Sequence, residues 1–246
     1  MSTKKPYDVW FFKGNIKVGK MLTWNKLAGN TKFGAEGCKG TCGDNCCGCW
    51  NADNWRKSSC YVAKSYYRYP QTVIPAHVRN TIAMRTDMAG TFEALDKQLT
   101  RAKTKLPVRL HSSGELESVE ELRGWCELAK KHTDRPFYVY TKAYDIVNKL
   151  LGSGYELPEN MWINISIWHE KGIDCYKKWS HIPNIRAFVY DDKYDYASHG
   201  IETKVHCPAY TKKGKMNHSQ TCDGCGWCFG QKAGKRNKII ACYDHS

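Results

Sequence analysis

Most of the thirteen cysteines fall into two groups, one near each end of the chain, at spacings typical of metal ligands. In the first group, within residues 37–60, Cys42, Cys46 and Cys49 follow the pattern Cys-x3-Cys-x2-Cys. Three thiolates at this spacing suit a [4Fe–4S] cube and leave its fourth iron open. An open iron binds a substrate or cofactor, so this pattern indicates a cluster that takes part in a reaction.

The first group also contains cysteines that could complete the ligand set. Either Cys38 or Cys60 would supply a fourth thiolate and close the cluster, whereas Cys47 adjoins Cys46 and is interpreted as a spare. Four thiolates bind zinc equally well, so zinc is the alternative metal. Ligand softness and the many glycines of the loop favour an iron–sulfur cluster.

The second group combines Cys207, which precedes Pro208, with a run of cysteines at intervals of three residues. The run is Cys222, Cys225 and Cys228, and the four cysteines match the ligand pattern of a ferredoxin-like [4Fe–4S] site in reverse order. All four ligands would come from the protein, so we expect a closed cluster, which suits electron transfer or structure. Zinc is again the alternative.

Composition restricts the setting in which these cysteines work. No apolar run approaches the ~20 residues of a membrane helix, and no apolar segment follows the N-terminal lysines as in a signal peptide. We therefore expect a cytoplasmic protein without a membrane partner. In a reducing compartment, grouped cysteines indicate metal ligands rather than disulfides, and an odd total does not favour a closed disulfide framework.

The formal net charge of +14 suggests a polyanionic partner such as nucleic acid. Two lysine runs, residues 212–215 and 232–238, flank the second cysteine group, with Trp227 and Phe229 between them. Aromatic and basic residues in this arrangement could contact nucleic acid. Two simpler explanations apply, because charge runs are usually solvated loops and metal-bound thiolates reduce the effective positive charge.

Hydrophobic periodicity predicts an α/β fold in which strands alternate with helices. Residues 8–24 are predicted to form a β-hairpin around a Gly-Asn turn. Helices are predicted at 61–68, stopped by Pro70, at 75–103 with Gly90 as a candidate break, from residue 118, at 143–151 and at 173–179. Strands are predicted at 108–110, 137–140, 161–167 and 185–190, with further candidates at 203–206 and 238–243. This alternation is typical of a parallel sheet, and so few units indicate a partial, open βα barrel.

The amino-acid composition of the sequence changes at Cys207. Residues 1–206 are predicted to form the partial-barrel domain, with the first cysteine group near its N-terminal end. Residues 207–246 contain few aliphatic residues before the last candidate strand. They are predicted to form a small metal-held lobe packed on that domain.

Polar residues follow the predicted strands, at the edge where the ligand site of a parallel sheet lies. Glu115 and Lys142 terminate the two clearest strands, so we expect them to be catalytic. Asn164 interrupts an otherwise apolar strand, which indicates a hydrogen-bonding role; we expect it and Ser166 to contact a cofactor. The other polar residues at these strand ends are His111, Ser112, Ser113, Gly114, Thr141, Trp168, His169, Tyr190, Asp191, Asp192 and His206. Together they suit acid–base or chelating chemistry.

The pattern Cys-x3-Cys-x2-Cys ahead of a βα-repeat sheet resembles the radical S-adenosylmethionine (SAM) enzymes. In that superfamily three cysteines hold a [4Fe–4S] cluster in a loop after the first strand, and the open iron binds the amine and carboxylate of SAM. A Gly-Gly-Glu-type segment after the second strand binds the SAM amine. Ser113, Gly114 and Glu115 occupy a comparable place, so the resemblance implies that they contact SAM.

A second resemblance covers most of the chain, which is similar to a family of phage and prophage proteins, the gene product eighty-eight type. The matching features are Cys60-Tyr-Val-Ala-Lys, Val108-Arg-Leu-His-Ser-Ser-Gly-Glu, Tyr138-Val-Tyr-Thr-Lys142, Asn164-Ile-Ser166, Cys207-Pro208, the Cys222–Cys228 run and His245. This resemblance implies the fold, the cysteine ligands and a phage-infected or prophage-bearing bacterial host.

The sequence thus predicts an iron–sulfur protein with two [4Fe–4S] clusters and radical-SAM-like activity, acting with an unidentified substrate or electron donor. The alternative is a metal-stabilised nucleic-acid-binding phage protein without catalysis. A third hypothesis is a protein whose metals are purely structural and which binds a host protein.

Overall fold

A seven-stranded sheet forms the centre of the computed structural model, which describes residues 8–33, 37–45, 50–51, 54–58, 60–168, 170–191, 195–213, 215–230 and 238–243. Its strands follow the order β1-β2-β5-β6-β7-β8-β9. They are β1 (Phe12–Lys13), β2 (Leu22–Trp24), β5 (Val108–Leu110), β6 (Phe137–Thr141), β7 (Met161–Ile167), β8 (Ile185–Asp191) and β9 (Ile239–Tyr243). A separate two-stranded sheet pairs β3 (Lys32–Phe33) with β4 (Cys38–Lys39).

Strand directions confirm the mostly parallel, open sheet and the N-terminal hairpin predicted from the sequence. β1 is antiparallel to β2, with Phe12 opposite Thr23, and every later pair in the sheet is parallel. β1 and β9 form its two edges, so the sheet does not close into a barrel. Because the parallel strands are adjacent in chain order and their crossovers are right-handed, the connecting helices lie on one face.

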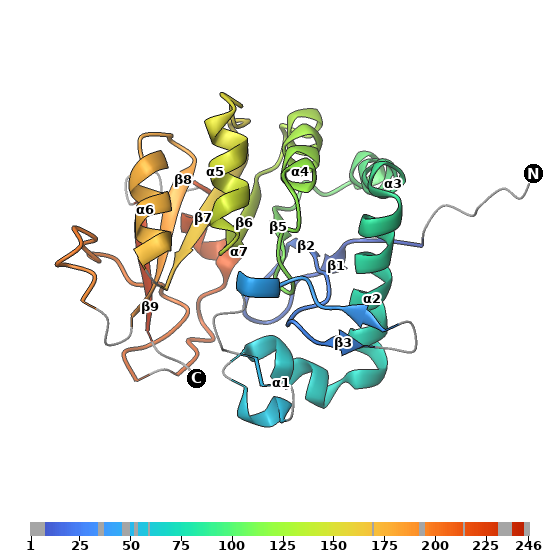
Figure 1. Ribbon diagram of the computed structural model, residues 1–246, viewed down its shortest axis with the longest axis horizontal. Coiled ribbons are helices and arrows are strands. Elements are labelled where there is room, and N and C mark those ends of the chain that lie inside the picture. The colour runs from blue at the N-terminus through green and yellow to red at the C-terminus, as the bar shows by residue number, and fades with distance from the viewer. Residues whose placement is uncertain are drawn as a thin grey trace, which may run out of the picture.

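The connecting helices stand side by side along that face, as Figure 1 shows for α4, α5 and α6. The helices are α1 (Tyr61–Arg68), α2 (Pro70–Thr86), α3 (Met88–Arg101), α4 (Val119–Lys131), α5 (Tyr144–Gly152), α6 (Glu170–Trp179) and the single turn α7 (Cys222–Cys225). Three short 3-10 turns accompany them: η1 (Gly43–Asn45), η2 (Trp55–Lys57) and η3 (Trp227–Phe229).

Local sequence explains where α4 begins. The Ser118 hydroxyl accepts a hydrogen bond from the Glu121 backbone N–H at 3.0 Å, which satisfies one donor that a helix start leaves unpaired. Glu120 and Glu121 occupy the first turn and Lys130 and Lys131 the last. This order of charge complements the helix dipole.

The first early helix is confirmed, because α1 ends at Arg68, ahead of Pro70. The second differs from the prediction in its start and its break. It begins at Pro70 rather than at residue 75, because the missing N–H and fixed φ of proline suit a first turn. The break between α2 and α3 falls at Asp87 rather than at Gly90. The Asp87 carboxylate accepts the Gly90 backbone N–H at 2.9 Å and so caps α3.

Alternation along each strand separates two faces of the sheet. On β7, Ile163, Ile165 and Ile167 are fully buried against the helices. Burial of each such side chain contributes about 1.5–3 kcal/mol. Trp162 and Asn164 point to the opposite face, which we call the open face.

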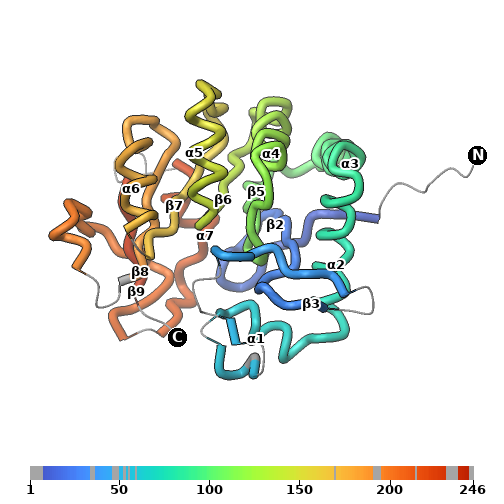
Figure 2. Tube along the Cα trace, in the orientation of Figure 1, coloured from blue at the N-terminus to red at the C-terminus, as the bar shows by residue number. Residues whose placement is uncertain are grey.

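The C-terminal segment packs on the open face, where η3 lies against β6 and β7 (Figure 2). The Tyr138 and Phe229 rings are 4.9 Å apart, and the Tyr138 hydroxyl donates to the Met21 sulfur at 3.1 Å. Gly230 has φ +72°, and a Cβ there would lie 2.0 Å from the Trp162 ring. Only glycine therefore allows the chain to leave η3 so close to the sheet.

The last segments confirm one candidate strand and correct another. Residues 239–243 form β9, parallel to β8, as the periodicity of 238–243 predicts. Residues 203–206 do not form a strand, and only a single parallel bridge joins His206 to Ala241. In the described part of the chain, no helix is long and apolar enough to cross a membrane.

Candidate functional site

Cys42 follows β4, within the long connection from β2 to β5. The Gly29 backbone N–H donates to the Cys42 Sγ at 3.3 Å, and the Cys42 N–H donates to the Gly29 carbonyl at 3.0 Å. A donor aimed at sulfur stabilises its thiolate form. Cys46 and Cys49, the other two members of the predicted triad, lie outside the described residues, as does the spare Cys47.

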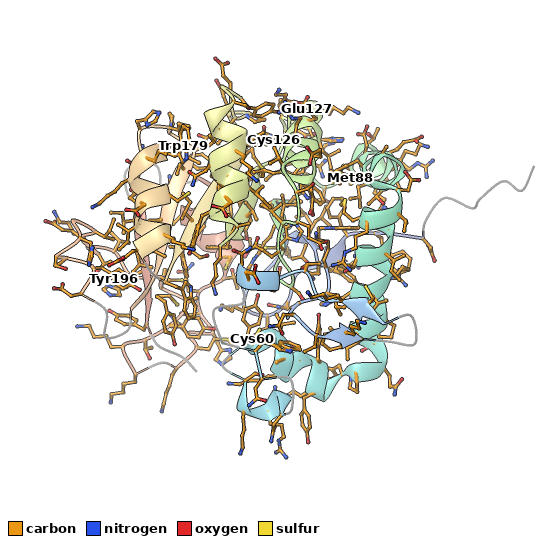
Figure 3. All side chains as sticks on the ribbon, viewed as in Figure 1. Cys60, Met88, Cys126, Glu127, Trp179 and Tyr196 are labelled. Atoms are coloured by element: carbon orange, nitrogen blue, oxygen red, sulfur yellow. The ribbon has the colours of Figure 1, made fainter. Side chains whose placement is uncertain are left out.

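Cys38 and Cys60, the two candidates for a fourth ligand, have different surroundings. Cys38 is buried on β4, and its Sγ lies 3.6 Å from an Arg85 guanidinium nitrogen on α2. Cys60 precedes α1 and is in electrostatic range of Tyr66, as Cys42 is. Cys42 and Cys60 both pack against the hydrophobic cluster that contains Cys38, and the Cys38 sulfur also faces α2. Figure 3 labels Cys60 at the start of α1.

The loop after β5 is fixed against the cysteine loop. The Glu115 backbone N–H donates to the Thr41 hydroxyl at 2.8 Å, one residue before Cys42. Gly114 has φ +82°, and a Cβ there would lie 2.8 Å from the Thr41 hydroxyl oxygen and 2.9 Å from the Lys26 carbonyl oxygen. The backbone of this loop thus approaches the cysteine loop as closely as glycine permits.

Ser113 is held in place by a buried polar network. Its hydroxyl donates to the Lys26 carbonyl at 2.9 Å and lies 3.1 Å from the His77 Nδ1. The Tyr66 hydroxyl lies 3.0 Å from the same nitrogen. Burial lowers the pKa of His77 to about 4, so its imidazole is neutral at pH 7.

The contact between Glu115 and Lys142, the predicted catalytic pair, is made by the Lys142 backbone N–H rather than by its ammonium. The Glu115 carboxylate accepts hydrogen bonds from the Thr141 hydroxyl at 2.7 Å, the Leu116 N–H at 2.9 Å and the Lys142 N–H at 2.8 Å. The Lys142 ammonium instead lies 3.9 Å from the centre of the Trp168 ring. Glu115 therefore stabilises the carboxyl end of β6, and the Lys142 ammonium lies over the Trp168 ring.

His111 belongs to a buried charged network rather than to an open rim. Its Nε2 lies 3.2 Å from a Glu121 oxygen, and the Lys26 ammonium contacts Glu121 at 2.7 Å and Glu117 at 3.0 Å. Burial would raise the pKa of Glu121, but the Lys26 ammonium and the hydrogen bond from His111 outweigh it and lower that pKa. Breaking such a buried pair is costly, so these residues stabilise the loop after β5.

Asn164 connects β7 to the C-terminal cysteines. Its side-chain amide donates to the Cys228 carbonyl at 3.0 Å and to the Val139 carbonyl at 3.2 Å. Its buried Oδ1 has no hydrogen-bond partner among the described residues. Ser166 shares this face of β7, and its carbonyl accepts the Tyr144 hydroxyl at 2.6 Å. Asn164 thus positions the C-terminal cysteine group, as its place in an apolar strand indicates.

The other predicted rim residues have varied surroundings. Tyr190 stacks on Trp168 with ring centres 4.8 Å apart, and His206 stacks on Tyr243 at 4.2 Å. The buried Ser112 hydroxyl has no hydrogen-bond partner among the described residues. His169, Asp192, His245 and the side chain of Asp191 lie outside the part of the chain that the structure describes.

The C-terminal cysteine group, Cys207, Cys222, Cys225 and Cys228, gathers on the open face. The Tyr140 hydroxyl hydrogen-bonds to the Cys228 sulfur, and the Cys222 N–H donates to the Lys17 carbonyl at 3.3 Å. Burial raises the pKa of the Cys222 and Cys228 thiols.

Sequence reasoning missed three residues beside this group: Lys17, Arg109 and Cys242. Lys17 and Arg109 are in electrostatic range of Cys207 and Cys222. Cys242 donates a hydrogen bond to Cys207. Alternation along β9 could have identified Cys242, but the places of the two cations depend on how the hairpin and the C-terminal segment meet.

Tyr61 links the two cysteine groups. It is in electrostatic range of Cys42 and Cys60 on one side and of Arg109 on the other, and its hydroxyl donates to the Ser112 carbonyl. The N-terminal and C-terminal groups therefore border the same region of the molecule.

The described residues do not form the site of a single metal ion. Among the described residues, no three Cys, His, Asp or Glu side chains converge closely enough to share one metal ion. Four thiolates on one zinc, each at about 2.3 Å, must lie about 3.8 Å apart. The thiolates of a [4Fe–4S] cube instead bind separate irons.

Comparison with known proteins gives one match. A protein-family model described as gene product 88 matches residues 11–236. No curated protein matches the chain, and no solved structure does.

Proposed function

The chain belongs to the gene product 88 family, and we propose that it is an iron–sulfur protein of phage origin with radical-SAM-like activity. The observation that carries the proposal is the hydrogen bond from the Glu115 N–H to the Thr41 hydroxyl. It joins the Ser113–Glu115 loop, which follows β5, to the residue before Cys42, in the connection that leads from β2 to β5. Ligands of parallel sheets bind at such strand ends.

In this proposal Cys42, Cys46 and Cys49 hold the N-terminal cluster. A [4Fe–4S] cluster on three thiolates supplies an open iron for SAM and the electron that cleaves its sulfonium bond. The Gly29 N–H stabilises the Cys42 thiolate, and a hydrogen bond to a ligand sulfur also tunes the reduction potential. A fourth thiolate from Cys38 or Cys60, which lie in the same packed cluster as Cys42, would close the iron–sulfur cluster.

The strand-end residues take separate roles in the proposal. Ser113 and Gly114 shape a loop whose backbone faces the cysteine loop, where the SAM amine would bind. Glu115 is a positioning residue, since its carboxylate already accepts three hydrogen bonds. Lys142, over the Trp168 ring, is the candidate to touch the substrate.

The C-terminal cysteine group holds the second cluster and relays electrons from an external donor. The Cys-x2-Cys-x2-Cys spacing with the remote Cys207-Pro208 favours a ferredoxin-like cluster over zinc. Positive charge from Lys17 and Arg109 compensates the negative charge of the thiolates. Asn164 holds the Cys228 backbone in place through its amide.

The test is anaerobic incubation of the fully loaded protein with SAM and dithionite. We expect 5′-deoxyadenosine from the wild type and from Cys126→Ser, whose thiol is buried on α4, and none from Cys42→Ser. Figure 3 labels Cys126 among the helices, away from Cys60. Fully loaded wild type that forms no 5′-deoxyadenosine contradicts the proposed activity.

One observation favours the alternative, a nucleic-acid-binding protein. Lys212, Lys213 and Lys215 are exposed beside a turn that the Tyr210–Met216 bridge closes, and the chain carries a net charge of +14. Phosphate contacts release counterions, so this function requires affinity that falls steeply with salt. A gel-shift titration at rising salt decides it, because weak, salt-insensitive binding contradicts a phosphate-binding surface.

A further inference from the structure

A fifth thiol, Cys242, reaches the C-terminal cysteine group from the sheet itself. On β9, Ala241 packs into the helix-side core, so its neighbour Cys242 projects to the open face. The Cys242 side chain is buried, with 2% of the residue exposed, and its thiol donates a hydrogen bond to Cys207. Cys242 therefore lies in direct contact with a proposed ligand.

Backbone hydrogen bonds fix Cys207 and Cys242 relative to each other. The Cys207 N–H donates to the Ala241 carbonyl at 2.7 Å, and the Ala241 N–H donates to the Val205 carbonyl at 2.9 Å. These bonds fasten the 205–207 segment alongside β9. Ligands carried on such paired backbone are placed more accurately than ligands on loops.

The positive charges of Lys17 and Arg109 beside these thiols favour the binding of an anionic group. Lys17 is in electrostatic range of Cys207, Cys222 and Cys242, and its ammonium donates to the Tyr210 hydroxyl at 2.6 Å. Among the described residues, neither Lys17 nor Arg109 has a carboxylate within ion-pair distance. Buried charge is normally compensated, and a metal cluster on four thiolates supplies negative charge at this place.

A cube has four irons, and five thiols lie in this region. Cys242 lies on a strand of the sheet, whereas Cys225 ends the single turn of α7. Cys228 lies near Cys207, Cys222 and Cys225, and its sulfur accepts the Tyr140 hydroxyl. Paired backbone holds Cys242 beside Cys207, so the sheet-borne thiol is the better placed of the two remaining cysteines.

We propose that Cys242 is a ligand of the C-terminal cluster together with Cys207, Cys222 and Cys228, and that Cys225 is the spare thiol. This inference rests on the proposed function, because it assumes that the group holds an iron–sulfur cluster. In this arrangement Cys207 and Cys242 bind the cluster from the side of β9, and Cys222 and Cys228 bind it from the C-terminal segment. The cluster therefore joins β9 to that segment.

The test compares three serine variants of the full chain after anaerobic reconstitution. They are Cys242→Ser, Cys225→Ser and the control Cys175→Ser, whose thiol is equally buried but lies on α6 in the helix-side core. Iron and acid-labile sulfide are counted for each chain, and the reduced protein is examined by electron paramagnetic resonance. Circular dichroism shows which variants fold, and Cys242→Ala serves as a second variant.

We expect about eight irons per chain in wild type, Cys225→Ser and Cys175→Ser, four for each cube. Cys242→Ala should retain about half of the iron, and Cys242→Ser should either do the same or show a changed resonance as serine oxygen replaces sulfur. Full iron with an unchanged resonance in both Cys242 variants overturns the inference, as does iron loss from Cys225→Ser. Wild type that takes up no iron overturns the proposed function itself.

Discussion

The Thr41 hydroxyl accepts the backbone N–H of Glu115 at 2.8 Å and donates to the Leu27 carbonyl at 2.9 Å. One buried side chain thereby joins the cysteine loop to the loop after β5. Any ligand held by the cysteine loop would meet residues whose position depends on this contact. The relationship between Thr41 and Glu115 is therefore where the fold and the proposed chemistry connect.

Removing the Thr41 hydroxyl should affect stability and activity together. Thr41→Val leaves the buried Glu115 N–H unpaired, which costs about 1–3 kcal/mol of unfolding free energy. Thr41→Ser keeps the hydroxyl and is the matched control. Urea unfolding and the rate of SAM cleavage measure the two effects. A valine variant that matches the serine variant in both would show that the contact has no such role.

Gly114 should not tolerate alanine. Gly114→Ala combines a left-handed backbone with a Cβ at 2.8–2.9 Å from Thr41 and Lys26 atoms. Gly200 provides the control, since it has φ +70° but no atom within 4 Å of its added Cβ. We expect Gly200→Ala to cost about 1 kcal/mol through backbone strain alone and Gly114→Ala to cost more. Equal losses in thermal unfolding would contradict the close approach of the two loops.

The stability of the protein should depend on pH through His77. Burial lowers the folded-state pKa of His77 to about 4, against 6.5 in the unfolded chain. Between pH 6.5 and 4 the unfolded state therefore binds a proton that the folded state does not bind. The free energy of unfolding falls as the pH drops from 6.5 towards 4. The loss reaches roughly 3 kcal/mol at pH 4.

Denaturant unfolding at several pH values measures this dependence. His77→Gln should remove that part of the pH slope, while His181→Gln, at an exposed site, should leave it unchanged. An undiminished slope in His77→Gln would contradict a neutral buried imidazole at position 77.

The sequence predicts much of this fold because its strands are strongly patterned. Residues 161–167 form β7 with the predicted bounds, since alternating isoleucines fill one face and Asn164 marks the other. The stop of α1 before Pro70 was predicted, but the start of α2 at Pro70 was not, because the missing N–H that ends one helix also suits the first turn of the next. Residues 203–206 have strand-like composition, but only one bridge to β9 forms.

The candidate site was less predictable, because its parts meet only through tertiary structure. The spacing of Cys207, Cys222, Cys225 and Cys228 indicates a ligand set without locating it. Nothing local places Lys17 from the hairpin and Cys242 from the last strand beside those cysteines. Glu115 shows the opposite problem, because its position after a strand suggests an acid–base role, whereas its carboxylate accepts three internal hydrogen bonds.

Lys17 should raise the reduction potential of the proposed C-terminal cluster. A nearby positive charge favours the more negative, reduced state, so Lys17→Gln should shift the potential downward by on the order of tens of millivolts. Lys20→Gln removes the same charge from an exposed position in the same loop and should shift it less. Redox titration followed by electron paramagnetic resonance measures both. Equal shifts would contradict a specific role for Lys17.

The central claim is that both cysteine groups hold iron–sulfur clusters, and metal analysis of anaerobically purified protein tests it most directly. We predict brown protein that absorbs broadly near ~400 nm and contains about eight irons and eight sulfides per chain. Colourless protein with stoichiometric zinc and no iron would contradict the claim.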